Sequence, residues 1–424
     1  MKLKPELCAH VDDEGKLVLP PELASRFGLK AGTQVLVDEA GNNLRLRKPV
    51  THLSKVYIEP TNRCNLECRT CMRNVWDEPL GQMSNETFLR IIEGLKRFSP
   101  PPAIFFGGFG EPLSHPEIVD MITLAKTLGS SVQLITNGTL LTKDLSKRLI
   151  EAGLDMLWVS LDGAKPESYA DIRLGAALPE VISNLADFRD ACPLHEDFLE
   201  FFFPYPSNPK IGIVFVAMKR NFSDLPSVVH LGNRLGAMEF LITNVLPYTP
   251  EMCDEVLYRR SISDGFFTPS AFRLQLPKID VDNLTREGLF RMMGGGHSIY
   301  LAGIGFEEVI NRCPFIEKGA TAISWEGSVS PCLPLLHSHM SYVDERERFS
   351  RRYLVGNVVE RDLNDLWNLP EYVAFRERAQ EFEFSPCTSC GGCDLFEKNE
   401  EDCFGNPFPT CGGCLWAQGI IQCP

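Results

Sequence analysis

The chain has 424 residues and a formal net charge of −14 at neutral pH, with 44% hydrophobic and 23% charged residues. These values are typical of a large globular protein, and at roughly 100–200 residues per domain the length predicts about two to four domains. The negative charge argues against general affinity for nucleic acid, and no apolar run reaches the roughly 20 residues that a membrane span needs.

The cysteine content indicates metal binding. The first residues, MKLKPELCAHVDDEGK, lack the apolar core of a secretory signal, so we expect a cytoplasmic protein in a reducing compartment, where disulfides are rare. Fifteen cysteines are more than packing requires, and nine of them lie between Cys313 and Cys423. Three others, Cys8, Cys192 and Cys253, are expected to pack as small apolar side chains.

Residues 1–50 form a predicted unit of their own. They are expected to fold as a strand, a short helix opened by Pro21, and two short strands joined at EAGNN. The pattern GKLVLP, followed by the strand LRLR, resembles the swapped-hairpin domain of AbrB- and SpoVT-like regulators, a family that binds DNA as a dimer. Here eight Lys/Arg face seven Asp/Glu, a net charge of +1, which is weak for neutralising phosphates. Dimerisation, or docking of a partner, is therefore favoured over DNA binding.

Residues 51–250 alternate apolar strands with amphipathic helices. The strands are KVYIEP, AIFFGG, VQLITNG, MLWVSLDG, IGIVFVAMK and MEFLITNVLP, each of the length expected for a buried parallel strand. Helices are expected to start after Ser84, at Pro116, after Thr142, at Pro179 and at Asp224. Six such units in series predict an α/β fold with right-handed crossovers, in which a parallel sheet curls into a partial (β/α)6 barrel.

Every unusual sequence follows one of these strands. In order they are TNRCNLECRTC, GGFGEP, TNG, SLDG, MKRN and NVLPY. In parallel α/β folds the chemistry gathers in the loops at the carboxyl ends of the strands. We therefore expect these six loops to form one site.

The first loop carries Cys64, Cys68 and Cys71. A disulfide is disfavoured in a reducing compartment, and a structural zinc site needs a fourth ligand that no nearby Cys or His supplies. Three thiolates can instead hold a four-iron cluster by three of its irons and leave one iron open to a ligand. The spacing, after a first barrel strand, resembles the radical SAM superfamily. That resemblance implies a [4Fe–4S] cluster whose open iron binds S-adenosylmethionine (SAM), which is cleaved reductively to a 5′-deoxyadenosyl radical.

The same resemblance extends to the other loops. GGFGEP is similar to the family's GGEP motif, which binds the SAM amino group, although a glycine turn would explain this stretch if it stood alone. The residues expected to bind SAM are Gly107, Gly108, Gly110, Glu111, Asn137, Ser160 and Asp162. Met218 and Asn221 are weaker candidates that simple loop packing would also explain. The aromatic residue that the family usually has before the third cysteine is replaced by Thr70, so Met72 or a residue after the sixth strand is expected to pack on the adenine.

A connecting segment, residues 251–310, leads to a cysteine-rich unit, residues 311–424. The paired C-x-x-C sequences in this unit would by themselves suggest zinc ribbons. Gly327 lies five positions before Cys332, and the sequence VGNVVERDLNDLW follows. Together with the paired cysteines, these features resemble the SPASM domain, which holds auxiliary four-iron clusters. The resemblance implies two auxiliary [4Fe–4S] clusters, and the candidate ligands are Cys313, Cys332, Cys387, Cys390, Cys393, Cys403, Cys411, Cys414 and Cys423. Cys313 and Cys332 are expected in the inner cluster and Cys387, Cys390 and Cys393 in the outer, with one cysteine in surplus.

Nearly the whole chain, and above all the tail EEDCFGNPFPTCGGCLWAQGIIQCP, resembles the maturases of tungsten-dependent aldehyde ferredoxin oxidoreductases. This implies a radical SAM enzyme acting on a tungsten-pterin oxidoreductase or its cofactor, with an external electron donor of the ferredoxin or flavodoxin type. The N-terminal hairpin adds the expectation of a homodimer. A SPASM-type enzyme modifying a peptide substrate is the alternative, and a DNA-binding regulator with a redox-sensing barrel is a third. His337 and His339 are candidate acid/base groups that a surface loop would explain equally well.

Overall fold

The computed structural model describes residues 9–27, 29, 35, 37–40, 43–193, 209–259, 284–285, 312–343, 345–390 and 393–424. Cys8 and most of the predicted connecting segment, including MMGGGHS, lie outside these residues. In the described ranges, no helix has both the length and the apolar character to cross a bilayer.

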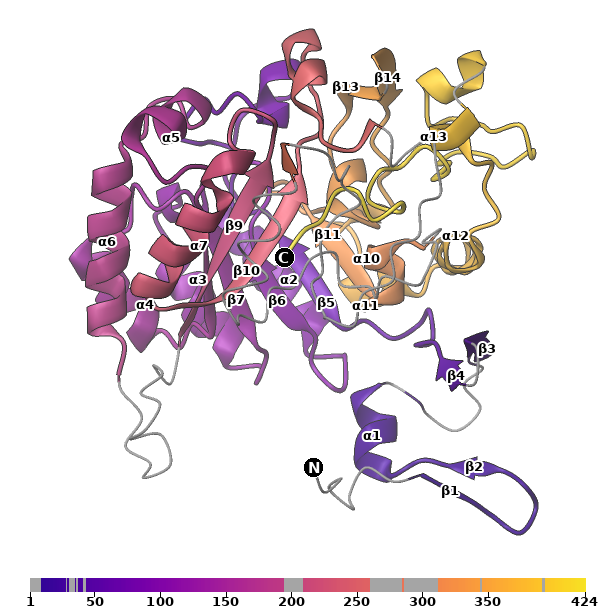
Figure 1. The fold of residues 1–424 in the computed structure, drawn as a ribbon. Coiled ribbons are helices and arrows are strands. Elements are labelled where there is room, and N and C mark those ends of the chain that lie inside the picture. Colours follow the sequence, from indigo (N-terminus) through magenta and orange to yellow (C-terminus); the bar gives the residue numbers. More distant parts are fainter. Residues whose placement is uncertain are drawn as a thin grey trace.

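Six parallel strands form the centre of the molecule in the order that the sequence predicts (Figure 1). They are β5 (Lys55–Ile58), β6 (Ala103–Phe106), β7 (Val132–Thr136), β8 (Met156–Ser160), β9 (Lys210–Ala217) and β10 (Ala237–Asn244). Each strand pairs in parallel with the next along the chain, so their carboxyl ends meet at one rim. The predicted α/β fold with a partial barrel is confirmed.

Three strands of the C-terminal unit continue this sheet. β11 (Ala320–Ile323) lies parallel to β5, and the antiparallel strands β12 (Ser328–Ser330) and β15 (Gly356–Asn357) follow it. The sheet therefore has nine strands and crosses the predicted boundary between the barrel and the cysteine-rich unit. The division of the chain at residues 50, 250 and 310 stays a prediction.

Helices surround the outside of the curved sheet (Figure 1). They are α2 (Asn85–Leu95), α3 (Ile118–Lys126), α4 (Lys143–Glu151), α5 (Pro166–Ile172), α6 (Leu178–Ala191) and α7 (Leu225–Arg234). Five of these lie where the sequence predicts a helix, and the short helix α5 was not predicted. The predicted N-caps are present, since the hydroxyls of Ser84 and Thr142 accept hydrogen bonds from the backbone N–H groups of Thr87 and Leu145.

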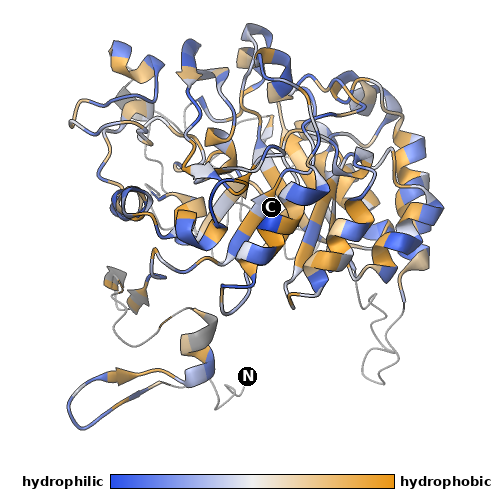
Figure 2. Ribbon diagram, turned by 180° about the vertical axis from the view of Figure 1, so that it is seen from behind, coloured by the Kyte–Doolittle hydropathy of each residue, from blue (hydrophilic) through white to orange (hydrophobic). Residues whose placement is uncertain are grey.

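The helices cover the sheet with one apolar face. In α2, Phe88, Ile91, Ile92 and Leu95 are buried against the strands, and each buried side chain of this kind contributes about 1.5–3 kcal/mol. Figure 2 shows the same division along the barrel, with apolar strands inside and polar stripes on the outer faces of the helices. The core therefore lies between sheet and helices and leaves the rim of strand ends to the loops.

The N-terminal unit lies below the C-terminal unit in the view of Figure 1. It contains a hairpin of β1 (His10–Val11) and β2 (Leu17–Val18), helix α1 (Pro21–Arg26), and a second hairpin of β3 (Val37–Ala40) and β4 (Asn43–Leu46). The predicted strand, helix and pair of strands are present as β2, α1, β3 and β4, and β1 was not predicted. The resemblance to a swapped-hairpin domain stays a prediction.

The rest of the C-terminal unit packs on the far end of the sheet. It consists of α10 (Pro314–Glu317), the antiparallel pair β13 (His339–Val343) and β14 (Arg346–Ser350), α11 (Leu363–Trp367), α12 (Pro370–Glu381) and the short helix α13 (Cys387–Cys390). The hairpin of β13 and β14 contributes Val343 to a buried cluster that also contains Met72 of the three-cysteine loop. The unit thus reaches over the rim that carries the predicted site.

Candidate functional site

The three cysteines lie together in the loop after β5. All three are free thiols, and Cys64 and Cys68 lie close enough to Cys71 for their charges to affect its pKa. The backbone N–H of Cys71 donates a hydrogen bond to the carbonyl of Cys68. Burial raises the pKa of Cys64 and raises the pKa of Cys71 to about 11, so metal binding at these thiols has to displace protons. Three thiols on one loop fit a four-iron cluster that keeps an open iron.

Donors from outside the loop reach two of the sulfurs. Asn137 Nδ2, after β7, lies 3.8 Å from Cys64 Sγ and 3.0 Å from Asn65 Oδ1. Arg173 Nη1, after α5, lies 3.9 Å from Cys68 Sγ. Hydrogen bonds and positive charge at the sulfurs stabilise thiolate ligands, and they belong to the features that set a cluster's potential.

The glycines of GGFGEP are needed for close packing. A Cβ atom on Gly110 would lie 2.1 Å from the Thr61 carbonyl oxygen, and one on Gly108 would lie 2.7 Å from Glu59 Cγ. The N–H of Glu111 also donates to the carbonyl of Arg63 at 2.8 Å. GGFGEP therefore packs directly against the backbone of the three-cysteine loop. A residue with a Cβ atom at position 108 or 110 would force the two loops apart.

The carboxylate of Glu111 bonds within the protein. It is 2% exposed and accepts hydrogen bonds from Thr136 Oγ1 and the Asn137 N–H, both at 2.7 Å, and from the Leu113 N–H at 3.0 Å. Burial raises its pKa, which these three donors oppose. In this structure Glu111 ties the β6 loop to the end of β7, and its predicted contact with SAM stays a prediction.

Asp162, predicted to contact SAM, is fully buried in an ion pair that the sequence did not reveal. Its Oδ2 bonds Arg173 Nε at 2.6 Å and Nη2 at 2.5 Å, while its Oδ1 accepts from the Val216 N–H at 2.7 Å. Burial lowers the pKa of Arg173, but the charge of Asp162 outweighs this and raises it above its usual range. Asp162 thus orients a permanent cation toward Cys68. The feature of the sequence that could have indicated this ion pair is Arg173 in IRLGAAL, which lies close in sequence to Asp162 in SLDG.

The remaining candidates are buried around these loops. Ser160 ends β8, and Met218 and Asn221 lie after β9, where Asn221 bonds the backbone of Met218, Val216 and Asp162. Met72 packs with Leu246 and Tyr248, which follow the sixth strand. The two alternatives offered for adenine packing therefore belong to one apolar cluster.

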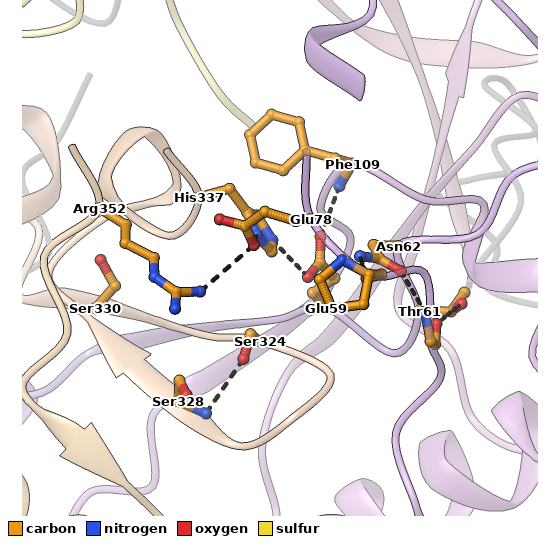
Figure 3. Close-up of polar contacts among 12 residues, drawn as sticks. Glu59, Thr61, Asn62, Glu78, Phe109, Ser324, Ser328, Ser330, His337 and Arg352 are labelled. Carbon is orange, nitrogen blue, oxygen red and sulfur yellow. Dashed lines mark hydrogen bonds and ion pairs between the residues drawn. The ribbon is translucent and has the colours of Figure 1, made fainter. Parts of the chain in front are cut away.

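His337 joins the C-terminal unit to the rim of the barrel (Figure 3). Its Nε2 lies 2.9 Å from Glu59 Oε2, and its Nδ1 lies 2.6 Å from Glu78 Oε2. The other oxygen of Glu59 accepts from the N–H of Phe109 in GGFGEP at 3.0 Å. Since each ring nitrogen faces a carboxylate, the imidazolium form satisfies both contacts. His337 is 2% exposed, so it does not lie on a surface loop.

We expect replacement of His337 by glutamine to destabilise the protein in a pH-dependent way. Burial alone would lower the pKa of His337, but the bonds to Glu59 and Glu78 raise it to about 9. Its stabilising contribution is therefore complete below the unfolded value of about 6.5 and disappears as the pH rises through about 9. At about pH 7 the loss should be about 3 kcal/mol.

Anaerobic thermal unfolding from about pH 7 to about pH 10 measures this effect. The difference in melting temperature between wild type and H337Q should shrink as the pH rises. The matched control is H230Q, which changes an exposed histidine on α7. A difference for H337Q that is the same at both pH values would contradict a charged His337.

Four cysteines of the C-terminal unit line one cavity. They are Cys313, Cys332, Cys411 and Cys414. The space not filled by protein atoms is about 750 Å³ with its mouth included. Burial raises the pKa of all four thiols, that of Cys313 to about 12. Four thiols around one cavity are the donor set of a four-iron cluster. Cys411 and Cys414 therefore line the same cavity as Cys313 and Cys332, the expected inner pair.

The other C-terminal cysteines lie elsewhere. Cys387 is partly buried near Cys403, whereas Cys393 and Cys403 are exposed. The side chain of Cys390 lies outside the described residues. Cys423 is separate from the cavity lining, accepts a hydrogen bond from Trp416 Nε1 at 3.4 Å and has Lys55 nearby.

Comparison with known proteins agrees with this geometry. Residues 58–198 match the radical SAM superfamily, and residues 313–394 match the iron–sulfur cluster-binding domain called SPASM. The structure of SuiB from Streptococcus suis bound to S-adenosylmethionine, 16% identical, covers 84% of this chain and 73% of its own with a TM-score of 0.53, which shows a shared fold.

Two curated relatives cover most of the chain. The tungsten-containing aldehyde ferredoxin oxidoreductase cofactor-modifying protein of Pyrococcus furiosus is 33% identical over 87% of this chain and 96% of its own. The AdoMet-dependent heme synthase of Methanosarcina barkeri is 25% identical over 84% of this chain and 93% of its own.

The fold, the three-cysteine loop and the cysteine-rich unit define a radical SAM enzyme with a SPASM domain. Such an enzyme uses SAM, a [4Fe–4S] cluster and auxiliary iron–sulfur clusters. Within this class, the chain belongs to the family of the tungsten-containing aldehyde ferredoxin oxidoreductase cofactor-modifying protein.

Proposed function

We propose that the enzyme acts as a maturase that modifies the pterin cofactor, or the protein, of a tungsten-dependent oxidoreductase. The observation that carries this proposal is the 33% identity with the cofactor-modifying protein of Pyrococcus furiosus, which extends over 96% of that relative. The similarity includes both the barrel and the cysteine-rich unit, so it is not limited to the SAM-binding loops.

The contacts described above support an assignment of ligands. Cys64, Cys68 and Cys71 would hold the SAM cluster, which with SAM bound supplies the one-electron cleavage that yields a 5′-deoxyadenosyl radical. The four cysteines of the cavity would hold the inner auxiliary cluster. The outer auxiliary cluster would take Cys387, Cys393 and Cys403 and, from the C-x-x-C spacing, Cys390. Cys423 is then the surplus thiol.

This chain's own groups would bind SAM and exclude water. Arg173, held by Asp162 and directed at Cys68, is placed to bind the SAM carboxylate by a charge-assisted hydrogen bond. Asn137 and Ser160 would supply further polar contacts, since both stand at strand ends on the same rim. The apolar cluster of Met72, Leu246 and Tyr248 would exclude water on the adenine side.

The partners follow from the same chemistry. Reduction requires an external donor of the ferredoxin or flavodoxin type, and free thiols fit a reducing cytoplasm. A homodimer through the N-terminal unit is supported by apolar side chains that stand exposed on its short strands. These are Val11, Leu17, Val37 and Leu44, with exposed fractions of 66%, 54%, 55% and 73%. A second copy would cover them.

Expression of the tungsten oxidoreductase with and without this protein tests the proposal. We expect the oxidoreductase to be inactive when it is made alone, and to gain activity together with a mass change in its isolated cofactor or its polypeptide when the maturase is present. The matched control is coexpression with the C68A variant, which should restore neither. Full activity and identical masses without the maturase would refute the proposal. A mass change confined to an unrelated short peptide would favour the peptide-modifying alternative.

A further inference from the structure

Arg348 is a buried cation between the two groups of C-terminal cysteines. It lies in β14, is 4% exposed, and lines the cavity together with Cys411 and Cys414. Its guanidinium donates a hydrogen bond to the carbonyl of Phe396 and lies 5.3 Å from the centre of the Phe396 ring. Cys387 of the outer group is also within its electrostatic reach.

Cysteines are the groups near this guanidinium that carry negative charge once they are deprotonated. Burial lowers the pKa of Arg348, and the opposing contributions come from Cys414, Cys387 and Cys411. Within the described part of the chain, no carboxylate forms an ion pair with it, whereas the neighbouring Arg346 pairs with Glu397 at 3.2 Å. A buried charge costs several kcal/mol unless an opposite charge compensates it. Anionic groups on the cysteines at either side would supply that compensation.

The backbone also makes room for the guanidinium. Gly413 stands between Cys411 and Cys414 in the sequence CGGC, and a Cβ atom there would lie 2.6 Å from Arg348 Cζ. The guanidinium is therefore seated directly against the cysteine loop, and any side chain at position 413 would push it away. Both the missing carboxylate and the missing Cβ point to the cysteines as the partner of Arg348.

We propose that Arg348 is a positioning residue that compensates the charge of both auxiliary clusters and raises their reduction potentials. A four-iron cluster held by four thiolates is anionic, and one-electron reduction adds a further negative charge. A buried cation nearby stabilises the reduced form more than the oxidised form, because Coulomb interactions are strong in a poorly polarisable interior. This inference rests on the proposed ligand assignment but not on the identity of the substrate.

Redox titration of the reconstituted full-length protein tests this role. Samples of wild type, R348Q and R348K would be reduced stepwise with dithionite, and the reduced clusters counted by electron paramagnetic resonance at each potential. R348Q should shift the reduction equilibrium of the inner auxiliary cluster by at least about tenfold toward the oxidised form, equivalent to about 59 mV for a one-electron couple. R348K, which keeps the charge, should shift it less.

The matched control is R351Q. Arg351 lies just beyond the same strand, is exposed, and pairs with Glu400 at the surface. It should leave the potentials unchanged. Unchanged potentials in R348Q with full iron content would overturn the inference. If R348Q instead loses iron, retention of iron in R348K supports a role of the charge, and equal loss in both variants overturns it. An iron content near four per chain in wild type would refute the cluster assignment separately.

Discussion

Replacement of Cys68 by alanine is expected to abolish SAM cleavage while most of the iron remains bound. Wild-type protein reconstituted without oxygen should hold about twelve irons, four in each of three clusters. C68A removes one of the three thiols that hold the SAM cluster, and the auxiliary sites lie in a different part of the fold. About eight irons should therefore remain. Iron analysis and the yield of 5′-deoxyadenosine under reduction measure both quantities.

The control for this experiment is C253A, since Cys253 is a partly buried thiol outside both groups of candidate ligands. It should keep about twelve irons and full cleavage. Cleavage by C68A at the wild-type rate would exclude the three-cysteine loop as the SAM cluster site. Loss of all iron in C68A would show that the three sites do not load independently.

Replacement of Arg173 by glutamine is expected to weaken SAM binding about 100-fold with the iron content unchanged. Removal of one partner from a hydrogen-bonded charge pair across a binding contact typically costs about 2–5 kcal/mol, because the other charge, here the SAM carboxylate, is left buried without a partner. Asp162, which is fully buried, loses its partner in the SAM-free and the SAM-bound enzyme alike, so that loss lowers stability and leaves the SAM affinity to the contact with Arg173. Equilibrium binding of SAM to the reconstituted enzyme measures the loss, and the change that SAM causes in the resonance signal of the reduced cluster provides a second readout.

Two further variants separate charge from geometry. R173K keeps the charge but cannot make the paired contact with Asp162, and it should recover part of the affinity. R189Q, on the outer helix α6, removes a partly exposed arginine that bonds Asp190 and the Arg234 carbonyl, and it should leave SAM binding unchanged. Wild-type SAM affinity in R173Q would show that Arg173 serves only to hold the loop, and that the SAM carboxylate is bound by other groups.

Local patterns were enough to predict the barrel, and long-range pairings were not. Each barrel strand is a continuous apolar run, and Ser84 and Thr142 cap helices within three residues of their own position. By contrast, β11, β12 and β15 are each four residues long or shorter. They belong to the sheet because β11 pairs with β5, which is far away in the sequence. No periodicity within such short strands predicts a partner so far away.

The same difference applies to the site. Spacing along the chain identified the three cysteines of the first loop and the candidates at the strand ends. It did not predict the ion pair of Asp162 with Arg173, because helix α5 lies between the two residues in the sequence. Nor did it predict the contacts of His337 with Glu59 and Glu78, because these residues lie in segments far apart along the chain. Glu59 gave a signal, as a carboxylate directly after a buried strand is costly without a partner. The grouping of Cys411 and Cys414 with Cys313 likewise needed the fold.

The shared sheet has a consequence for the order of folding during synthesis. β5 leads into the three-cysteine loop, yet β11 completes one of its edges, and the side chains of Tyr57 and Lys55 both donate to the carbonyl of Pro424 at 2.7 Å. The bond from Tyr57 spans 367 residues. A nascent chain of which only the part up to the three-cysteine loop has left the ribosome still lacks β11. It therefore cannot form the native surroundings of β5. The native surroundings of the three-cysteine loop are therefore complete only once β11 and the segment around Pro424 have folded against β5.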